Sequence, residues 1–258
     1  MNFCTFASGS SGNCAYVALG GEHFLLDAGI SGKRVAAALA QQGSPPLSGI
    51  LVTHEHGDHI TGLGVVARRF GVPIFATPLT WRYLLRHAKL GPLPETLVRH
   101  IEPGDTVQVG HVRVAAFDVP HDAAQPVGYT LTAGDEKLAW ATDLGHATDT
   151  VAFHLKNAQL IYVESNHDEE MVHKSRYHQS LKDRVLGKRG HLSNVACGEL
   201  LCQVCAPHTH VVLAHLSEEN NYPMLAQDTV GRILDANEIP VARLVVAERS
   251  APGDVMVI

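Results

Sequence analysis

The segment Gly49-Ile-Leu-Val-Thr53, followed directly by His54-Glu55-His56-Gly57-Asp58-His59, decides which fold the chain can adopt. Residues 49–53 form a short apolar run that is typical of a buried strand. The three histidines and one aspartate that follow cannot continue into an apolar core, because buried imidazoles and carboxylates need partners. A loop at the end of the strand can direct them toward a common point. Since histidine and aspartate suit zinc, manganese and iron, the segment predicts a metal-binding loop.

The spacing of these ligands favours two neighbouring metal ions over one. Four ligands so close in sequence seldom surround a single tetrahedral ion, because the loop geometry separates them. The alternative is a polar surface loop, which this density of ligands disfavours. Histidine is also unusually frequent in the whole chain, with 17 residues among 258, and it is the commonest metal ligand in proteins.

Outside the loop, strands alternate with helices on both sides of a β-rich middle, which indicates a layered α/β sandwich. We find no internal repeat or linker-like change of composition, so we predict one domain over residues 1–258. The expected elements are a hairpin at 15–19 and 22–27, strands at 49–53, 73–77, 106–109, 112–118, 127–132, 137–142, 160–164, 210–214 and 241–247, and helices at 31–42, 60–70, 78–88, 148–156, 193–205 and 222–236, with a polar, helix-rich segment at 168–190.

Charge and cysteine content narrow the class of protein. The formal net charge of −6 does not indicate a basic nucleic-acid-binding protein, although bound divalent cations would change the local field. The N-terminus lacks a basic and then apolar signal segment, and no apolar run approaches the length of a membrane span. Five cysteines without a signal segment argue against disulfides, so we expect a cytoplasmic protein without membrane contact. Cys202-Gln-Val-Cys205 has no second CxxC partner, and we interpret it as structural.

The HxHxDH pattern after an apolar strand resembles the signature of the metallo-β-lactamase superfamily. Further motifs of that superfamily follow in the expected order along nearly the whole chain. They are Leu26-Asp27-Ala28-Gly29, Pro120-His121-Asp122-Ala123, Ala141-Thr142-Asp143-Leu144-Gly145 and Leu213-Ala214-His215-Leu216-Ser217. His121, Asp143 and His215 would each be weak evidence alone, since a lone histidine or turn aspartate is more often structural.

This resemblance implies a fold and a ligand set. The fold is a four-layer αβ/βα sandwich in which helices flank two mixed sheets and the metals lie at one edge. The cofactors are two divalent ions, zinc or manganese. By the resemblance, His54, His56 and His121 bind one ion, Asp58, His59 and His215 bind the other, and Asp143 bridges them. Asp27 braces the metal loop from behind, and Asp58 and Asp143 count among the catalytic residues.

Within the superfamily the chain resembles the YycJ (WalJ) family, described as metal-dependent phosphodiesterases that act on DNA ends from 5′ to 3′. The motifs that carry this likeness extend from the N-terminus to residue 221. They are Ser8-Gly-Ser-Ser-Gly-Asn13, Pro126-Val-Gly-Tyr129, Glu164-Ser-Asn-His-Asp168, Gly190-His-Leu-Ser-Asn194 and Leu216-Ser-Glu-Glu-Asn-Asn221. DNA is thus the implied substrate, with RNA as an alternative, and the oligomeric state is not predicted.

Glu164 and His191 point to phosphodiester chemistry. In related nucleases a glutamate and a histidine at comparable places form a proton-relay pair, and a carboxylate-oriented imidazole can protonate a leaving oxygen. A solvated carboxylate and a structural histidine are the alternatives. Between them lies a basic stretch that could steer a phosphate backbone or be only a solvated helix face. It contains Lys174, Arg176, Lys182, Arg184, Lys188 and Arg189.

Several residues are candidate substrate contacts. Ser8, Ser10, Ser11 and Asn13 could present hydroxyl and backbone N–H groups to a terminal phosphate, although a tight glycine-rich hairpin would explain them equally well. His191 and Asn220 are further candidates. About 70 residues separate Asp143 from His215, too few for the inserted β-CASP domain of larger relatives.

Two other functions stay open from the sequence. A thioesterase or lactonase could use the same metal loop, but it would not need Glu164, His191 or the basic stretch. A non-catalytic nucleic-acid-binding or regulatory protein would be expected to lack metal ligands, and none of the seven is missing.

Overall fold

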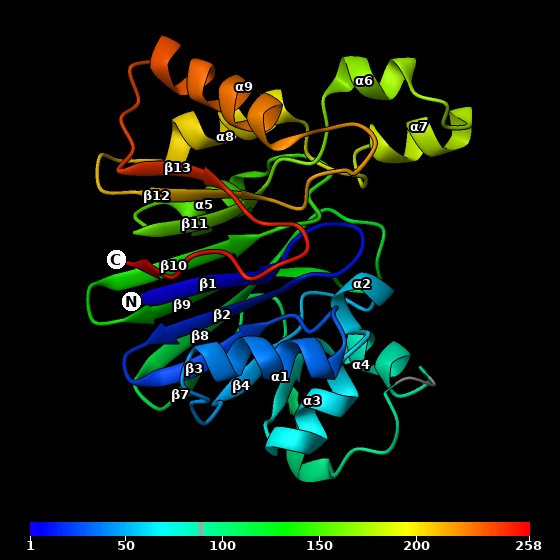
Figure 1. Cartoon of the computed structure of the whole chain (residues 1–258), viewed down its shortest axis with the longest axis vertical. Helices are drawn as coiled ribbons and strands as arrows, with labels where there is room; N and C mark the ends of the chain where they lie inside the picture. The colour runs from blue at the N-terminus through cyan, green and yellow to red at the C-terminus, as the bar shows by residue number, and fades with distance from the viewer. Residues whose placement is uncertain (88–89) are drawn as a thin grey trace.

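The computed structural model describes residues 1–87 and 90–258, and the strands of these residues form two mixed seven-stranded sheets (Figure 1). In the first sheet the order is β14 (Met256–Val257), β1 (Asn2–Ala7), β2 (Cys14–Leu19), β3 (Glu22–Leu26), β4 (Gly49–Leu51), β5 (Ile74–Ala76) and β6 (Val98–His100). In the second it is β13 (Arg243–Val246), β12 (His210–Ala214), β11 (Leu160–Glu164), β10 (Glu136–Ala141), β9 (Val127–Ala133), β8 (Val112–Asp118) and β7 (Thr106–Val109).

Helices cover the outer face of each sheet. The core outside the first sheet includes α1 (Gly32–Gln41), α3 (Leu63–Phe70) and α4 (Pro78–Leu84). The core outside the second includes α5 (Asp149–Leu155), α8 (Asn194–Val204) and α9 (Pro223–Ala236). The remaining helices are the short α2 (Gly57–Ile60), a 3₁₀ turn (Glu95–Leu97), and α6 (Glu169–Lys174) and α7 (Gln179–Val185), which form an arm beside α8 in Figure 1. The predicted αβ/βα sandwich is therefore confirmed.

Alternation along each strand produces the central core between the sheets. In β2, Ala15 and Val17 face the inner core, whereas Cys14 and Tyr16 face the outer core beneath α1 and α3. This is the expected result of the two-residue period of a strand that is buried on both faces. Trp140 of β10 stacks on its neighbour Tyr162, with ring centroids 3.7 Å apart, in the same inner core.

Each sheet has an antiparallel half and a parallel half. β3 runs parallel to β4, and β10, β11 and β12 run parallel to one another. Parallel strands end at the same edge of a sheet, so the loops that follow them converge. This topology determines where the functional side chains meet.

The observed elements agree closely with those expected from sequence, with a few differences. The helix expected at 60–70 is two helices. α2 forms within the metal loop and ends at Ile60, and α3 begins only at Leu63. The helix expected at 78–88 starts at Pro78 and ends at Leu84, and residue 88 lies outside the described residues. Strands β1, β6 and β14 were not predicted. β1 is buried on both faces and lacks the alternation of a half-exposed strand.

The two ends of the chain meet in the first sheet, because Asn2 and Phe3 of β1 pair with β14. Among residues 1–87 and 90–258, no helix combines the length and apolar character that a membrane crossing requires.

Candidate metal centre

The side chains of the candidate centre follow the carboxyl ends of several strands. Asp27 comes directly after β3, the histidine-rich loop after β4, Asp143 after β10, and His215 directly after β12. Asp27, Asp143 and His215 have φ angles of 56°, 59° and 55°, in the left-handed region that non-glycine residues rarely adopt. Such strained backbone is concentrated at functional sites, where the surrounding fold holds it in place.

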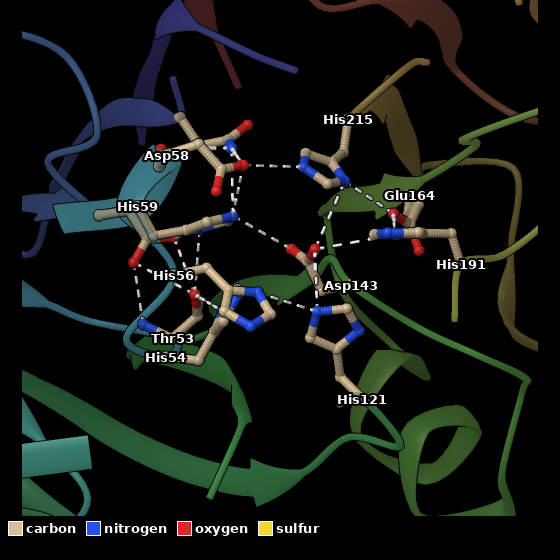
Figure 2. Close-up of polar contacts among 12 residues, drawn as sticks. Thr53, His54, His56, Asp58, His59, His121, Asp143, Glu164, His191 and His215 are labelled. Carbon is tan, nitrogen blue, oxygen red and sulfur yellow. Dashed lines mark hydrogen bonds and ion pairs between the residues drawn. The ribbon is translucent and has the colours of Figure 1, made fainter. Parts of the chain in front are cut away.

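The structure brings all seven predicted metal ligands together (Figure 2). His54, His56 and His121 form one group whose ligand atoms lie within 4.8 Å of one another. Asp58, His59 and His215 form a second group by the same criterion. These are the two sets that the sequence resemblance implied, and such buried histidine and aspartate clusters are consistent with a dinuclear metal site.

Asp143 lies between the two groups. Its Oδ2 is 3.4 Å from Nε2 of His59, and its Oδ1 is 3.5 Å from Nε2 of His121. The side chain is 2% exposed, and Oδ2 has no hydrogen-bond partner among the described residues. Oδ1 is also 3.6 Å from Nδ1 of His215, so this buried carboxylate lies beside histidines of both groups, as a bridging ligand would.

Contacts to Nδ1 orient three of the histidine rings. Nδ1 of His59 donates to Asp27 at 2.7 Å, and Nδ1 of His121 donates to the carbonyl of Gly190 at 3.1 Å. Nδ1 of His54 contacts the Thr53 hydroxyl at 3.0 Å. These contacts fix the tautomer and leave Nε2 of each ring for the centre, as in most protein metal sites.

Unpaired buried atoms show that the residues fit metal ions. Nε2 of His54 and Nε2 of His215 are both buried without a hydrogen-bond partner among the described residues. Buried polar atoms are normally paired, so an unpaired ring nitrogen in each ligand group calls for a partner that accepts its lone pair. Divalent cations that bind nitrogen and oxygen satisfy this requirement.

The pKa values of the histidines also favour a site for positively charged ions. Burial, together with the neighbouring His59, His121 and His56, lowers the pKa of His54 well below its usual value, so this ring is neutral. Burial alone would lower the pKa of His59, but the carboxylates of Asp27, Asp143 and Asp58 raise it well above the usual range. Positive charge is therefore favoured beside these carboxylates.

Glu164 connects His191 to the centre. Its Oε1 accepts from Nδ1 of His191 at 2.8 Å and from Nδ1 of His215 at 2.7 Å. Its Oε2 accepts from the backbone N–H groups of Leu144 at 2.7 Å and Leu192 at 3.0 Å. Burial would raise the pKa of Glu164, but His191 and His215 hold it well below the usual value. Glu164 thus orients a predicted metal ligand as well as the predicted relay histidine.

The predicted substrate contacts lie in different surroundings. Ser10 and Ser11 are exposed at the turn between β1 and β2. Asn13 is buried, and its amide donates to Asp58 Oδ2 at 3.1 Å and lies 3.1 Å from Nε2 of His59. These contacts favour a role in positioning the metal loop over direct contact with substrate. Asn220 is buried and its backbone carbonyl accepts from the N–H of Asp168.

The basic stretch is partly occupied by structural contacts. Arg184 donates to Asp122 at 2.6 Å, and Arg189 donates to the backbone carbonyl of His121 at 2.7 Å. Lys174 pairs with Glu170 one turn away on α6. Arg184 and Arg189 thus anchor the arm of α6 and α7 to the loop that presents His121.

Two hydroxyl groups position the ligands, a role that the sequence did not predict for either of them. The Thr53 hydroxyl lies between Asp27 and the rings of His54 and His59. The Ser8 hydroxyl accepts from the backbone N–H of His215 at 2.8 Å. A hydroxyl next to a ligand gives no sequence signal of its own, because serine and threonine are common at strand ends.

Replacing Gly29 with alanine should disturb the metal loop. A Cβ on Gly29 would collide with the backbone carbonyl of Asp58, and overpacking of this kind costs about 1–3 kcal/mol. We expect a lower melting temperature and weaker metal binding, measured by thermal unfolding with and without added zinc. Gly57→Ala is the matched control, since a Cβ there meets nothing within 4 Å. Equal behaviour of the two variants would contradict this account of the loop.

Comparison with known proteins gives matches over nearly the whole chain. Residues 22–216 match the family model described as the Beta-lactamase superfamily domain. The chain is 40% identical to exodeoxyribonuclease YycJ of Bacillus anthracis, over 91% of this chain and 89% of that protein. It is 37% identical to exodeoxyribonuclease WalJ of Streptococcus pneumoniae, over 89% and 87% of the two chains. The structure of Zn²⁺-bound PqqB from Methylobacterium extorquens superposes with a TM-score of 0.68 at 17% identity, over 98% of this chain and all of that one.

Proposed function

Because the chain belongs to the metallo-β-lactamase superfamily and is closely related there to the YycJ/WalJ exodeoxyribonucleases, we propose that this metal-dependent hydrolase removes nucleotides from DNA ends. We assign it the 5′-to-3′ direction that the family resemblance implies. The observation that carries the proposal is the Glu164–His191 pair, whose carboxylate also holds His215 of the ligand cluster. A metal site alone would serve a thioesterase equally well, whereas this pair suits a reaction whose leaving oxygen needs a proton.

We assign the ligands as the two groups in the structure suggest. One divalent ion would be held by His54, His56 and His121. The other would be held by Asp58, His59 and His215, and Asp143 would contact both ions. Nitrogen and carboxylate ligands suit zinc and manganese. When bound, two such ions activate water and neutralise the charge of a phosphate.

The chain's own residues would orient the substrate and transfer the proton. Nδ1 of His191 donates to Glu164, which leaves Nε2 for the substrate. Burial would lower the pKa of His191, but Glu164 and then Asp143 raise it above its usual value, so the ring can hold a proton near neutral pH. We propose that His191 gives this proton to the leaving oxygen, and that Ser10 and Ser11 contact the DNA end.

We also propose that residues 1–258 act as one domain. Ligands come from loops of both sheets, and the terminal strands β1 and β14 pair with each other. A cut between the two sheets would divide each ligand group.

Removing the metal should abolish activity. We expect purified protein to release nucleotides from the 5′ end of duplex DNA, to lose all turnover in a chelator, and to recover it on addition of zinc or manganese. The measurement uses DNA labelled at either end, with RNA and a thioester as comparison substrates. Turnover that survives complete metal removal would contradict the metal-dependent mechanism, loss of the 3′ label first would contradict the direction, and preferred thioester hydrolysis would contradict the substrate class.

A further inference from the structure

A cavity of about 510 Å³ lies beside the metal centre, and none of the seven predicted metal ligands lines it. Its walls come from the loop after β10, from α6, from the end of α7 and from one face of α8. In Figure 1 these elements are the α6–α7 arm and the neighbouring α8. Its volume lies within the usual range for sites that bind small molecules or single substrate groups.

The cavity adjoins the centre through His191. This ring lines the cavity and also lies 3.8 Å from Asp143 Oδ1 through its Nδ1. Gly145, two residues after Asp143, lines the cavity as well. A group in the cavity could therefore contact His191, whose ring lies beside the ligand cluster.

The inner wall combines buried apolar side chains with one unsatisfied polar atom. Leu192 and Leu200 are buried and line the cavity, and so does His167, which is 1% exposed. Nδ1 of His167 has no hydrogen-bond partner among the described residues. A wall of this composition suits a flat ring with apolar faces and polar atoms at its edge.

The rim is polar but not basic. His146, His173, Glu169, Glu199 and Gln203 line the cavity and are exposed. Neither lysine nor arginine occurs among the described lining residues, so the rim lacks the cations that a phosphate would need. Its carboxylates can instead accept hydrogen bonds from the amino groups of a base, as acidic side chains do with cytosine.

We propose that this cavity binds the nucleobase next to the scissile phosphate. The inference rests on the proposed function, since it assumes that the phosphodiester lies at the metal centre. A base is joined to its phosphate by a single sugar, so a phosphate held at the cluster would bring the attached base to the adjacent cavity. The enzyme would then hold the end of the strand by its base as well as by its backbone.

The test uses a variant that fills the cavity and a matched control on the same helix. Ala196 lines the cavity from α8, and Ala196→Phe would occupy it. The adjacent Val195 is 45% exposed and is not part of the lining, so Val195→Phe adds the same ring outside the cavity. Thermal unfolding of both metal-loaded variants shows whether they remain folded.

Two measurements are made on each metal-loaded protein. In the first, wild type should bind deoxycytidine monophosphate about tenfold more tightly than 2-deoxyribose 5-phosphate, which lacks the base. In the second, an abasic end should lower kcat/KM for DNA about tenfold. Ala196→Phe should lose both preferences, Val195→Phe should keep both, and bis(p-nitrophenyl) phosphate should be hydrolysed by all three proteins.

Each outcome decides a separate question. The proposal that the cavity binds a base would be overturned by either of two results. One is equal binding of deoxycytidine monophosphate and 2-deoxyribose 5-phosphate by wild type, and the other is the same base preference in both variants. If Ala196→Phe does not fold, Gln203→Trp at the rim replaces it and is judged by the same base preference. If wild type hydrolyses bis(p-nitrophenyl) phosphate but no DNA, the proposed function fails, and nucleotide binding alone still decides whether the cavity recognises a base.

Discussion

Replacing Asp143 with asparagine should reduce kcat/KM by about a thousandfold or more, because the metal ions that this carboxylate is proposed to hold would supply several kcal/mol of charge stabilisation. Asparagine keeps the shape of the side chain and tolerates the left-handed φ of 59°, so the loss would report the charge and not the backbone. We expect the bound metal to fall below two ions per chain, measured by elemental analysis of dialysed protein.

The control for this variant is Asp135→Asn. Asp135 is exposed in the turn before β10, at the opposite end of the strand that leads to Asp143. It should leave metal content and turnover unchanged. Full activity of Asp143→Asn with two retained ions would exclude the proposed bridging role.

Replacing Glu164 with glutamine should lower kcat by about 10²–10⁴-fold, the usual range for loss of general acid–base catalysis. The two oxygens of Glu164 accept four hydrogen bonds, from His191, His215, Leu144 and Leu192. Glutamine has one accepting oxygen, so its amide group would oppose two donors inside a fully buried site. Stability should also decrease, by about 1–3 kcal/mol, because these donors are left unpaired.

Further variants separate the relay from the structural role of Glu164. His191→Ala removes the proposed proton donor and leaves the contact between Glu164 and His215. If the two residues act as one unit, Glu164→Gln combined with His191→Ala should lose little more activity than Glu164→Gln alone. Glu218→Gln is the control for the glutamine change, since that carboxylate is largely exposed. Unchanged turnover in His191→Ala would exclude the relay.

The fold followed from the sequence to a large extent. The β-hairpin at Gly20 and Gly21, the Ser31 and Ser193 helix caps and the apolar strands each depend on local residue patterns. β1 and β6 were missed for a physical reason as well. A strand buried on both faces has no alternation, and a three-residue edge strand is too short to show one.

The sequence by itself determined that a metal loop follows a buried strand, because the residues of His54 to His59 are adjacent in the chain. It also placed the outlying ligand motifs in order. The tertiary structure alone decided how they meet. Asp143 lies between the two ligand groups, and one oxygen of Glu164 accepts from histidines 27 and 51 positions away. Such contacts depend on strand order and register, and on three residues held at positive φ, which a linear pattern of residue types does not specify.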